Sequence, residues 1–393
     1  MRPQIIFVCV LLLASVTGAR AGSYQTLHNF LVDGGDGSSP MAGLTFDKAG
    51  NLYGVAAYDG PDYTDGLVFK LSPSPRGWDY NIVYNFAYYE PVGREPMGGL
   101  VIDDAGVIYG TNSFSDDDWE CGTVFASSPS GWFPLHTFTG PDGCVPKSNL
   151  RLSNGWLIGT TTGGGASGQG TLFFVDTASG SFYSYSFEKA EGTTPLGGFN
   201  IFFYGVTASG GTKGEGNVYR LGANGLVNKF SFGSNRQAGY APMGDLLPAY
   251  VNGVRTMYGT TSAGGKGGVG TVYRLSENQQ KPEQWQMSVL HSFSGADGKS
   301  PMAGLTSDAS GNLYGTTSQG GDWGCGTVFK LSPGINNQFK FSVVYSFNPY
   351  NEDSGGDGCH PISGVVLDAA GNLYGTTEYG GWYIWGTVYE ITP

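Results

Sequence analysis

The sequence predicts an all-β protein, specifically a seven-bladed β-propeller built from four-stranded antiparallel blades. One unit recurs seven times with a period of 45 to 61 residues, and its clearest copy is "GNLYGTTSQGGDWGCGTVFKLSP" at 311–333. Glycine supplies 67 of the 393 residues and aromatic residues supply 14%, whereas charged residues supply only 13%. Short apolar alternations bounded by Gly, Pro, Asp and Asn are typical of strands and tight turns. A repeat of this length indicates one supersecondary unit stacked on itself.

Each copy contains four segments with strand character, which in the sixth copy are 301–308, 311–318, 326–332 and 341–347. The first segment begins near a residue that recurs once per copy, namely Met41, Met97, Asn149, Leu196, Met243, Met302 and Ile362. The fourth segment ends at a recurring phenylalanine, namely Phe30, Phe86, Phe138, Phe187, Phe232, Phe293 and Phe347. Four antiparallel strands repeated seven times are the pattern of a seven-bladed propeller.

The two ends of the chain complement each other. Residues 24–30 form a lone segment of the fourth type, and the chain finishes with a segment of the third type at 386–392. We therefore expect the N-terminal strand to pair with the C-terminal blade, which removes a free sheet edge and closes the ring.

The first 21 residues have the features of an export signal. Arg2 precedes an apolar run at 5–16, and a small-x-small site follows at 19–21. We expect a signal peptide at 1–21, a single propeller domain at 22–393, and a secreted protein (extracellular or periplasmic) with no membrane insertion. The net charge of −12 argues against nucleic acid as a partner. We expect a monomer.

The repeated motifs also resemble a known family. The segments "GNLYGTT" at 311–317 and 371–377, each followed by Gly-Gly and by "GTVFKL" or "GTVYEI", resemble those of the GloVer-type tandem-repeat secreted proteins, a choice-of-anchor family. The resemblance covers essentially the whole chain after the signal, and copies three and four are degenerate. It implies a propeller and export. It implies no established reaction, so it supplies no catalytic residues.

Four cysteines after the signal occupy two repeated places. Cys121 and Cys325 precede third segments, whereas Cys144 and Cys359 precede the first segments of the following copies. Of the three possible pairings, only Cys121–Cys144 with Cys325–Cys359 repeats the same geometry. We predict these two disulfides between neighbouring blades, in keeping with an oxidising compartment. A metal site and free buried thiols are the alternatives.

Three of the four histidines share one position in the repeat, which other copies fill with Tyr or Phe: His28, His136 and His291. That position is therefore interpreted as a packing position. His360 lies elsewhere, in the loop that enters the seventh copy. The repeated Asp-Gly pairs are interpreted as turns, although Ca²⁺ is possible at 33–36 or 353–357. No other cofactor is predicted.

The strongest functional signal is departure from the repeat. The loops between second and third segments contain mainly glycine and other small or polar residues in copies three to five. In copies six, seven, one and two they are rich in aromatic and acidic residues. These copies are consecutive around a closed ring. We predict ligand-binding residues on one sector of one face, namely Trp382, Tyr383, Trp385, Trp323, Trp119, Tyr58, Tyr63, Asp62 and Asp118. The alternative is that these rings pack between blades.

Three functions are compatible with this sector. The first is a secreted propeller that binds a glycan or another polyhydroxylated ligand, because flat rings stack on sugars and carboxylates accept hydroxyl protons. The second is a glycoside hydrolase or polysaccharide lyase on the same face, with candidate catalytic residues His360, Asp117, Glu95, Arg94 and Tyr89. The third is a protein-interaction platform.

Overall fold

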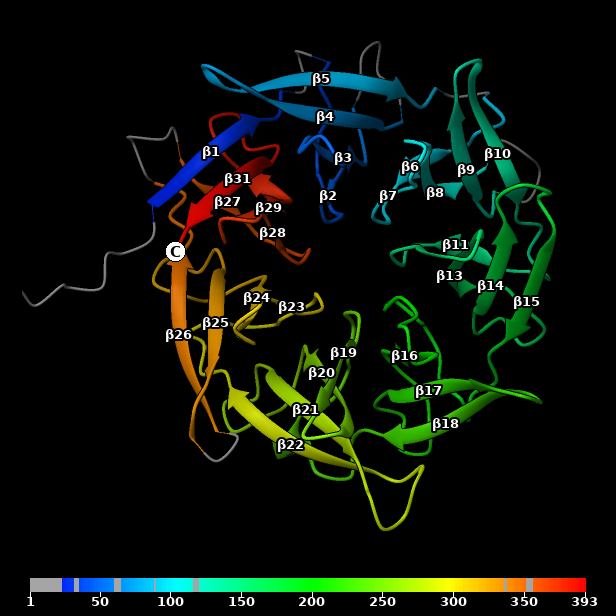
Figure 1. Cartoon of the computed structure of the whole chain (residues 1–393), viewed down its shortest axis with the longest axis vertical. Helices are drawn as coiled ribbons and strands as arrows, with labels where there is room; N and C mark the ends of the chain where they lie inside the picture. The colour runs from blue at the N-terminus through cyan, green and yellow to red at the C-terminus, as the bar shows by residue number, and fades with distance from the viewer. Residues whose placement is uncertain are drawn as a thin grey trace, which may run out of the picture.

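The computed structural model of the chain describes residues 23–31, 35–59, 65–87, 90–115, 120–335, 338–350 and 356–393. They form a seven-bladed β-propeller, as the repeat predicts (Figure 1). The blades are antiparallel sheets arranged around a central channel. In blades 1 to 6 the strands run from the channel outward in chain order, whereas blade 7 takes its outer strand from the N-terminus. The one helix among the described residues is the short 3-10 helix η2 (Arg236–Ala238).

The first three blades follow one another along the chain. Blade 1 contains β2 (Thr45–Phe46), β3 (Leu52–Ala56), β4 (Leu67–Ser74) and β5 (Gly77–Asn85). Blade 2 contains β6 (Arg94–Pro96), β7 (Val101–Ile102), β8 (Ile108–Phe114), β9 (Thr123–Ser128) and β10 (Gly131–Thr137). Blade 3 contains β11 (Cys144–Pro146), β12 (Arg151–Ser153), β13 (Trp156–Gly163), β14 (Thr171–Asp176) and β15 (Phe182–Ser186).

The next three blades include the degenerate one. Blade 4 contains β16 (Tyr204–Thr207), β17 (Asn217–Gly222) and β18 (Gly225–Ser231), and residues 196–203 form bends and a turn at the inner position. Blade 5 contains β19 (Leu247–Val251), β20 (Val254–Thr261), β21 (Thr271–Glu277) and β22 (Trp285–Ser292). Blade 6 contains β23 (Thr306–Ser307), β24 (Leu313–Thr317), β25 (Thr327–Pro333) and β26 (Phe339–Ser346).

Blade 7 combines the two ends of the chain. It contains β28 (Val366–Leu367), β29 (Leu373–Thr377), β31 (Thr387–Thr392) and, as its outer strand, β1 (Ser23–Asn29). β1 pairs antiparallel with β31, from Ser23 opposite Thr392 to Asn29 opposite Thr387 (Figure 1). A small two-stranded sheet of β27 (Gly358–Cys359) and β30 (Tyr379–Gly380) lies beside this blade.

The Gly-Thr-Thr motif joins blades 3, 5, 6 and 7 to the blade that follows each of them. The hydroxyl of Thr316 donates to the carbonyl oxygen of Ser363 in the following blade at 2.7 Å, and that of Thr376 donates to Ala42 at 2.9 Å. The second threonine of the motif faces the threonine that starts the third strand, as in Thr317 and Thr327, whose hydroxyls are 2.8 Å apart. The motif is therefore structural. Its Thr376 bond makes the blade 7 to blade 1 junction equivalent to those that follow blades 5 and 6.

The hydrophobic core lies between adjacent blades. All seven recurring phenylalanines at the ends of the fourth segments are buried. The motif glycine permits close packing, because a Cβ added at Gly315 would lie 2.6 Å from the Phe329 ring. Burial of such aromatic rings is the main favourable term in a fold of this composition.

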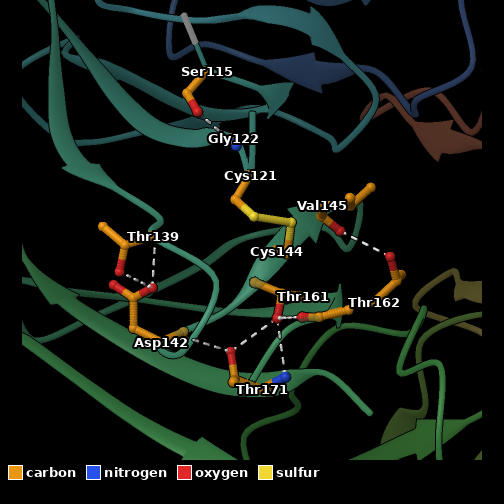
Figure 2. The surroundings of a disulfide bond; sticks show 11 residues. Ser115, Cys121, Gly122, Thr139, Asp142, Cys144, Val145, Thr161, Thr162 and Thr171 are labelled. Atoms are coloured by element: carbon orange, nitrogen blue, oxygen red, sulfur yellow. Dashed lines mark hydrogen bonds between the residues drawn. A yellow bond between two sulfur atoms is a disulfide. The ribbon is translucent and has the colours of Figure 1, made fainter. Parts of the chain in front are cut away.

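Both predicted disulfides are present, and each joins two successive blades. Cys121–Cys144 links blade 2 to blade 3 (Figure 2), and Cys325–Cys359 links blade 6 to blade 7, with Cα–Cα distances of 4.3 and 4.6 Å. In Figure 2 the first disulfide lies near the Thr161–Thr171 hydroxyl pair, and Thr171 also donates to the carbonyl oxygen of Asp142. The covalent link and the threonine pair thus fix the same entry loop.

Candidate ligand-binding site

The repeated histidines are structural, as interpreted from the sequence, and their partners are the Asp-Gly aspartates. His28 lies 2.9 Å from Asp36, and its ring stacks on Tyr80 of the next blade at a centroid distance of 3.7 Å. His291 repeats this arrangement with Asp297. Burial raises the pKa of Asp297, but hydrogen bonds from Ser294 and His291 outweigh that effect and hold the pKa below its ordinary value. These aspartates are therefore occupied in holding the blade entry.

The two stretches considered for Ca²⁺ are only partly described. Asp36 accepts hydrogen bonds from the Leu31 backbone and faces His28, and Asp357 accepts from the Tyr345 hydroxyl and the Asn348 backbone. Asp33 and 351–355 lie outside the described residues. Within the described ranges, no group of three or more His, Cys, Asp or Glu side chains is placed to hold a metal ion.

The loop between β29 and β31 presents aromatic side chains to solvent. Trp382 is 63% exposed and Tyr383 is 51% exposed, and Tyr379 and Trp385 are exposed as well. Neighbouring blades add Trp323 (53% exposed) and Tyr350 (76% exposed) from blade 6, together with Tyr58 from blade 1. We call these seven side chains the aromatic face. Exposed apolar side chains gathered on one face mark binding sites more often than chance.

Contacts within blades 6 and 7 organise part of the aromatic face. The rings of Trp323 and Tyr350 meet edge to face, with centroids 6.4 Å apart. The ring of Tyr379 lies 5.8 Å from that of His360. The backbone of Trp382 donates to the Asn29 side chain at 3.1 Å, so the outer strand β1 supports the loop. For these described residues the alternative of rings packed out of solvent between blades does not hold.

An acidic cluster lies beside these rings. His360 Nδ1 is 2.6 Å from Glu378 Oε2. Burial raises the pKa of Glu378, but hydrogen bonds from His360 and Tyr379 outweigh it and lower the pKa below its ordinary value. Burial also raises the pKa of the Tyr58 hydroxyl, and the nearby charges of Glu95 and Glu378 raise it further. Tyr58 is therefore coupled to carboxylates of both neighbouring blades, 2 and 7.

Two catalytic candidates from blade 2 lie in this neighbourhood. Burial raises the pKa of Glu95, and Arg94 partly opposes the rise. Arg94 Nη2 is 3.3 Å from Glu120 Oε1, and the guanidinium lies over the Phe114 ring at 5.4 Å. The structure therefore brings His360 to Glu378, whereas it directs Arg94 toward Glu120.

The positive φ angles of His360 and Glu95 belong to the repeat and carry no functional signal. One proline recurs in every copy of the repeat, at the entry to each blade. The residue before it always has φ between +52° and +65°, namely Ser39, Glu95, Val145, Thr194, Ala241, Ser300 and His360. Ile384 is different. It has φ +66° at a position filled by Gly168, Gly214, Gly268 and Gly324 in other copies. A β-branched residue in this region is strained.

Six of the predicted site residues lie outside the described residues, namely Trp119, Tyr63, Asp62, Asp118, Asp117 and Tyr89. The sequence interpretation missed Tyr379 and Ile384. Both depart from the repeat, since Ile384 replaces a glycine and Tyr379 stands where copy six has Gln319. A position-by-position comparison of the copies could have found them.

A comparison with protein families identifies a match over almost the whole chain. The model of the family described as Gloeobacter/Verrucomicrobia repeat matches residues 16–201 and again residues 200–393. No curated protein matches the chain at a significant level.

Similar solved structures include three of low identity. They are a luciferin-regenerating enzyme (14% identity, TM-score 0.43, covering 76% of this chain and 91% of the other), a putative oxidoreductase (glucose dehydrogenase) from Thermus thermophilus (13%, 0.45, 94% and 99%), and a putative 6-phosphogluconolactonase from Bacteroides fragilis (14%, 0.46, 86% and 89%). Likenesses this weak carry no information on function.

Proposed function

This chain belongs to the Gloeobacter/Verrucomicrobia repeat family, and on that premise we propose that it is a ligand-binding propeller whose aromatic face takes a glycan or another polyhydroxylated ligand. The observation that carries this proposal is the exposure of Trp382 and Tyr383 in a loop where blades 3 to 5 have small or polar residues. Large rings left in water are unfavourable for the isolated protein. Their presence is explained if a ligand covers them.

The chemistry of the face fits sugars. The flat faces of Trp and Tyr rings accept the C–H side of a pyranose, and the half-buried carboxylate of Glu95 can accept hydrogen bonds from hydroxyl groups. The strained Ile384 supports the same proposal, because a backbone outlier at a loop tip must be maintained by its surroundings and is found preferentially at ligand-binding sites.

The two disulfides support secretion into an oxidising compartment. No helix among the described residues is long and apolar enough to span a membrane.

Glycan binding is tested by isothermal titration and affinity electrophoresis against a panel of polysaccharides. We expect Trp382→Ala and Trp385→Ala to weaken binding by about 10-fold or more, because central aromatic side chains carry most of the energy of an interface. Tyr183→Ala is the matched control, since Tyr183 is 61% exposed but lies on the outer strand of blade 3. Equal binding by all four proteins would refute the proposal. Retention of a protein partner after deglycosylation would instead favour an interaction platform.

The second candidate is glycoside hydrolysis, and one observation favours it. Glu95 and Glu378 are both coupled to Tyr58, and their pKa values are shifted in opposite directions, with Glu95 raised and Glu378 lowered. Carboxyl groups with divergent pKa values are suited to the acid and base roles of this chemistry. Release of reducing ends that both Glu95→Gln and Glu378→Gln abolish would establish the activity. Glu188→Gln on blade 3 is the control.

A further inference from the structure

A hollow lies on the face of the disc opposite the aromatic face. It has a volume of about 870 Å³ and is lined by residues of blades 2 to 5, including the hairpin residues Asp103, Asp104 and Asn154. These hairpins join the first strand of a blade to its second strand, whereas the loops of the aromatic face join the second strand to the third. The two sets of loops lie at opposite ends of the second strand, and therefore on opposite faces of the disc. The volume falls within the ~300–1,000 Å³ typical of small-molecule sites. We call this hollow the lower cavity.

The irregular fourth blade contributes to this hollow. Residues 196–203 form bends and a turn where the other blades have inner strands, and Gly198 and Phe199 line the lower cavity. Asn149 of blade 3 reaches past this gap, and its Nδ2 donates to Asp245 Oδ2 of blade 5 at 3.0 Å. The backbone of Gly198 donates to the other oxygen of Asp245. The lower cavity is therefore an asymmetric feature of four consecutive blades and not a general property of the ring.

Among the described residues that line the lower cavity, Arg151 is the only cation. The same inner-strand position holds uncharged residues in the other copies, namely Thr45, Val101, Asn200, Leu247, Thr306 and Val366. The guanidinium of Arg151 is partly buried and has no ion-pair or hydrogen-bond partner within the described part of the chain. Burial lowers the pKa of Arg151, and no neighbouring carboxylate opposes this effect. The guanidinium is therefore available to an anionic ligand, because it carries five N–H donors and no acceptor.

The carboxylates of the same lining are already engaged. Asp103 accepts hydrogen bonds from the backbones of Ala105 and Val107 in its own hairpin. Asp104 pairs with Lys48 at 2.7 Å. Asp245 is held by Asn149 and Gly198, as described above. The lower cavity thus combines satisfied acids with one unsatisfied cation.

We infer that the lower cavity binds a small monocarboxylate, whose two oxygens pair with the guanidinium of Arg151. The planar fork of an arginine matches a carboxylate in two parallel hydrogen bonds. A dianionic phosphate fits the arginine equally well in shape. However, the three aspartates of the lining repel a dianion more strongly than a monoanion, so the lining favours the monocarboxylate over phosphate. The apolar part of the lining, including Val101, Leu150 and Phe199, accommodates the carbon skeleton of the acid.

The test is isothermal titration of the full chain with glucuronate, gluconate, benzoate, glucose and inorganic phosphate. We expect at least one carboxylate to bind, and Arg151→Gln to weaken that binding by about 10- to 100-fold, the range for a lost hydrogen bond to a charged group. Arg151→Lys keeps the charge but not the fork, so we expect an intermediate loss. Arg76→Gln is the control: it removes an equal charge from the exposed hairpin between β4 and β5, which does not line the lower cavity, so its affinity stays within about 2-fold of wild type.

Three outcomes overturn the inference: binding of no carboxylate at about 10 mM, equal binding by wild type and Arg151→Gln, or tighter binding of phosphate than of any carboxylate. Thermal unfolding of each variant shows whether the fold is intact. Trp382→Ala separates this inference from the proposed function. Carboxylate binding that survives Trp382→Ala and is lost in Arg151→Gln assigns the ligand to the lower cavity, whatever the outcome for glycans.

Discussion

Blades 5 and 7 build the same loop between their second and third strands from different side chains. In blade 5 a parallel bridge joins Gly264 and Val269, and in blade 7 the same bridge joins Gly380 and Trp385. The backbone nitrogen at the end of each loop donates to the first glycine of the pair, at 2.9 Å in blade 5 and 3.1 Å in blade 7. Both glycine pairs have φ near +80°. The backbone is therefore specified by the glycines and the hydrogen bonds.

The four positions between the glycine pair and the final glycine of this loop vary between blades, because the backbone conformation does not depend on their side chains. Blade 5 places Lys-Gly-Gly-Val at 266–269, whereas blade 7 places Trp-Tyr-Ile-Trp at 382–385, and all four of the latter side chains are exposed. Blade 6 uses the last of these positions for Cys325, which forms a disulfide. One scaffold thus carries an inert loop, a covalent link and an aromatic surface. The difference teaches that stability and binding are assigned to separate positions of one repeat.

The largest effect we expect concerns the covalent link of blade 6. Cys325→Val gives this loop the residue that blade 5 has, and with Cys359→Ser it removes the bond to blade 7. In the chain-entropy model the loss is about 3 kcal/mol of unfolding free energy. Urea unfolding under oxidising conditions measures it. The doubly substituted chain keeps Cys121–Cys144, so its stability should lie between those of the oxidised and the fully reduced wild type. A loss well below about 3 kcal/mol would show that threonine and backbone bonds already fix the blade junction.

The next effect concerns binding. Replacing 382–385 by Lys-Gly-Gly-Val should abolish glycan affinity, by about 100-fold or more if several aromatic anchors are lost together. The same replacement should leave the thermal midpoint unchanged or higher, because the backbone of this loop does not depend on these side chains. Titration and calorimetry measure the two quantities. A lowered midpoint with unchanged affinity would invert the assignment of roles between the two blades.

The architecture could be predicted from the sequence because the repeat is periodic. Seven phenylalanines, seven strand sets and two cysteine pairs in equivalent places leave few arrangements, and the disulfide Cys325–Cys359 follows from the topology. Burial could not be predicted in the same way. The sequence does not show whether a tryptophan such as Trp382 packs between blades or faces water. The direction of the loop backbone decides between these two placements.

The lower cavity shows a second limit of sequence reasoning. The fourth copy is recognisable as degenerate, but the loss of its inner strand depends on how 196–203 pack against blades 3 and 5. Arg151 and Asp245 are 94 positions apart, and nothing in the repeat indicates that both line one hollow. The pairing of His28 with Asp36 was likewise hidden, because each residue had a sufficient local explanation as a packing ring and as a turn.

A smaller effect sharpens the comparison at one backbone position. Ile384 in blade 7 has φ +66°, and the equivalent Gly268 in blade 5 has φ +75° with open space where a Cβ would lie. Ile384→Gly should stabilise the protein by about 1 kcal/mol, since it removes the strain of a β-branched residue. Gly268→Ile should destabilise it by a similar amount. Thermal unfolding of both variants measures these changes; stability lost on Ile384→Gly would mean that the isoleucine side chain packs productively.

The smallest effect concerns the acid dependence of the His360–Glu378 pair, which blade 6 replaces with Ser300 and Ser318. Hydrogen bonds from His360 and Tyr379 outweigh burial and lower the pKa of Glu378 from 4.5. A carboxylate with a depressed pKa in the folded state contributes stability above pH 4.5 and loses it as the pH falls through the folded value. Glu378→Gln should therefore cost up to about 1 kcal/mol at pH 7, and the cost should shrink as the pH falls below 4.5. Urea unfolding of both proteins across this range measures the difference, and a cost independent of pH would assign the role of Glu378 to packing.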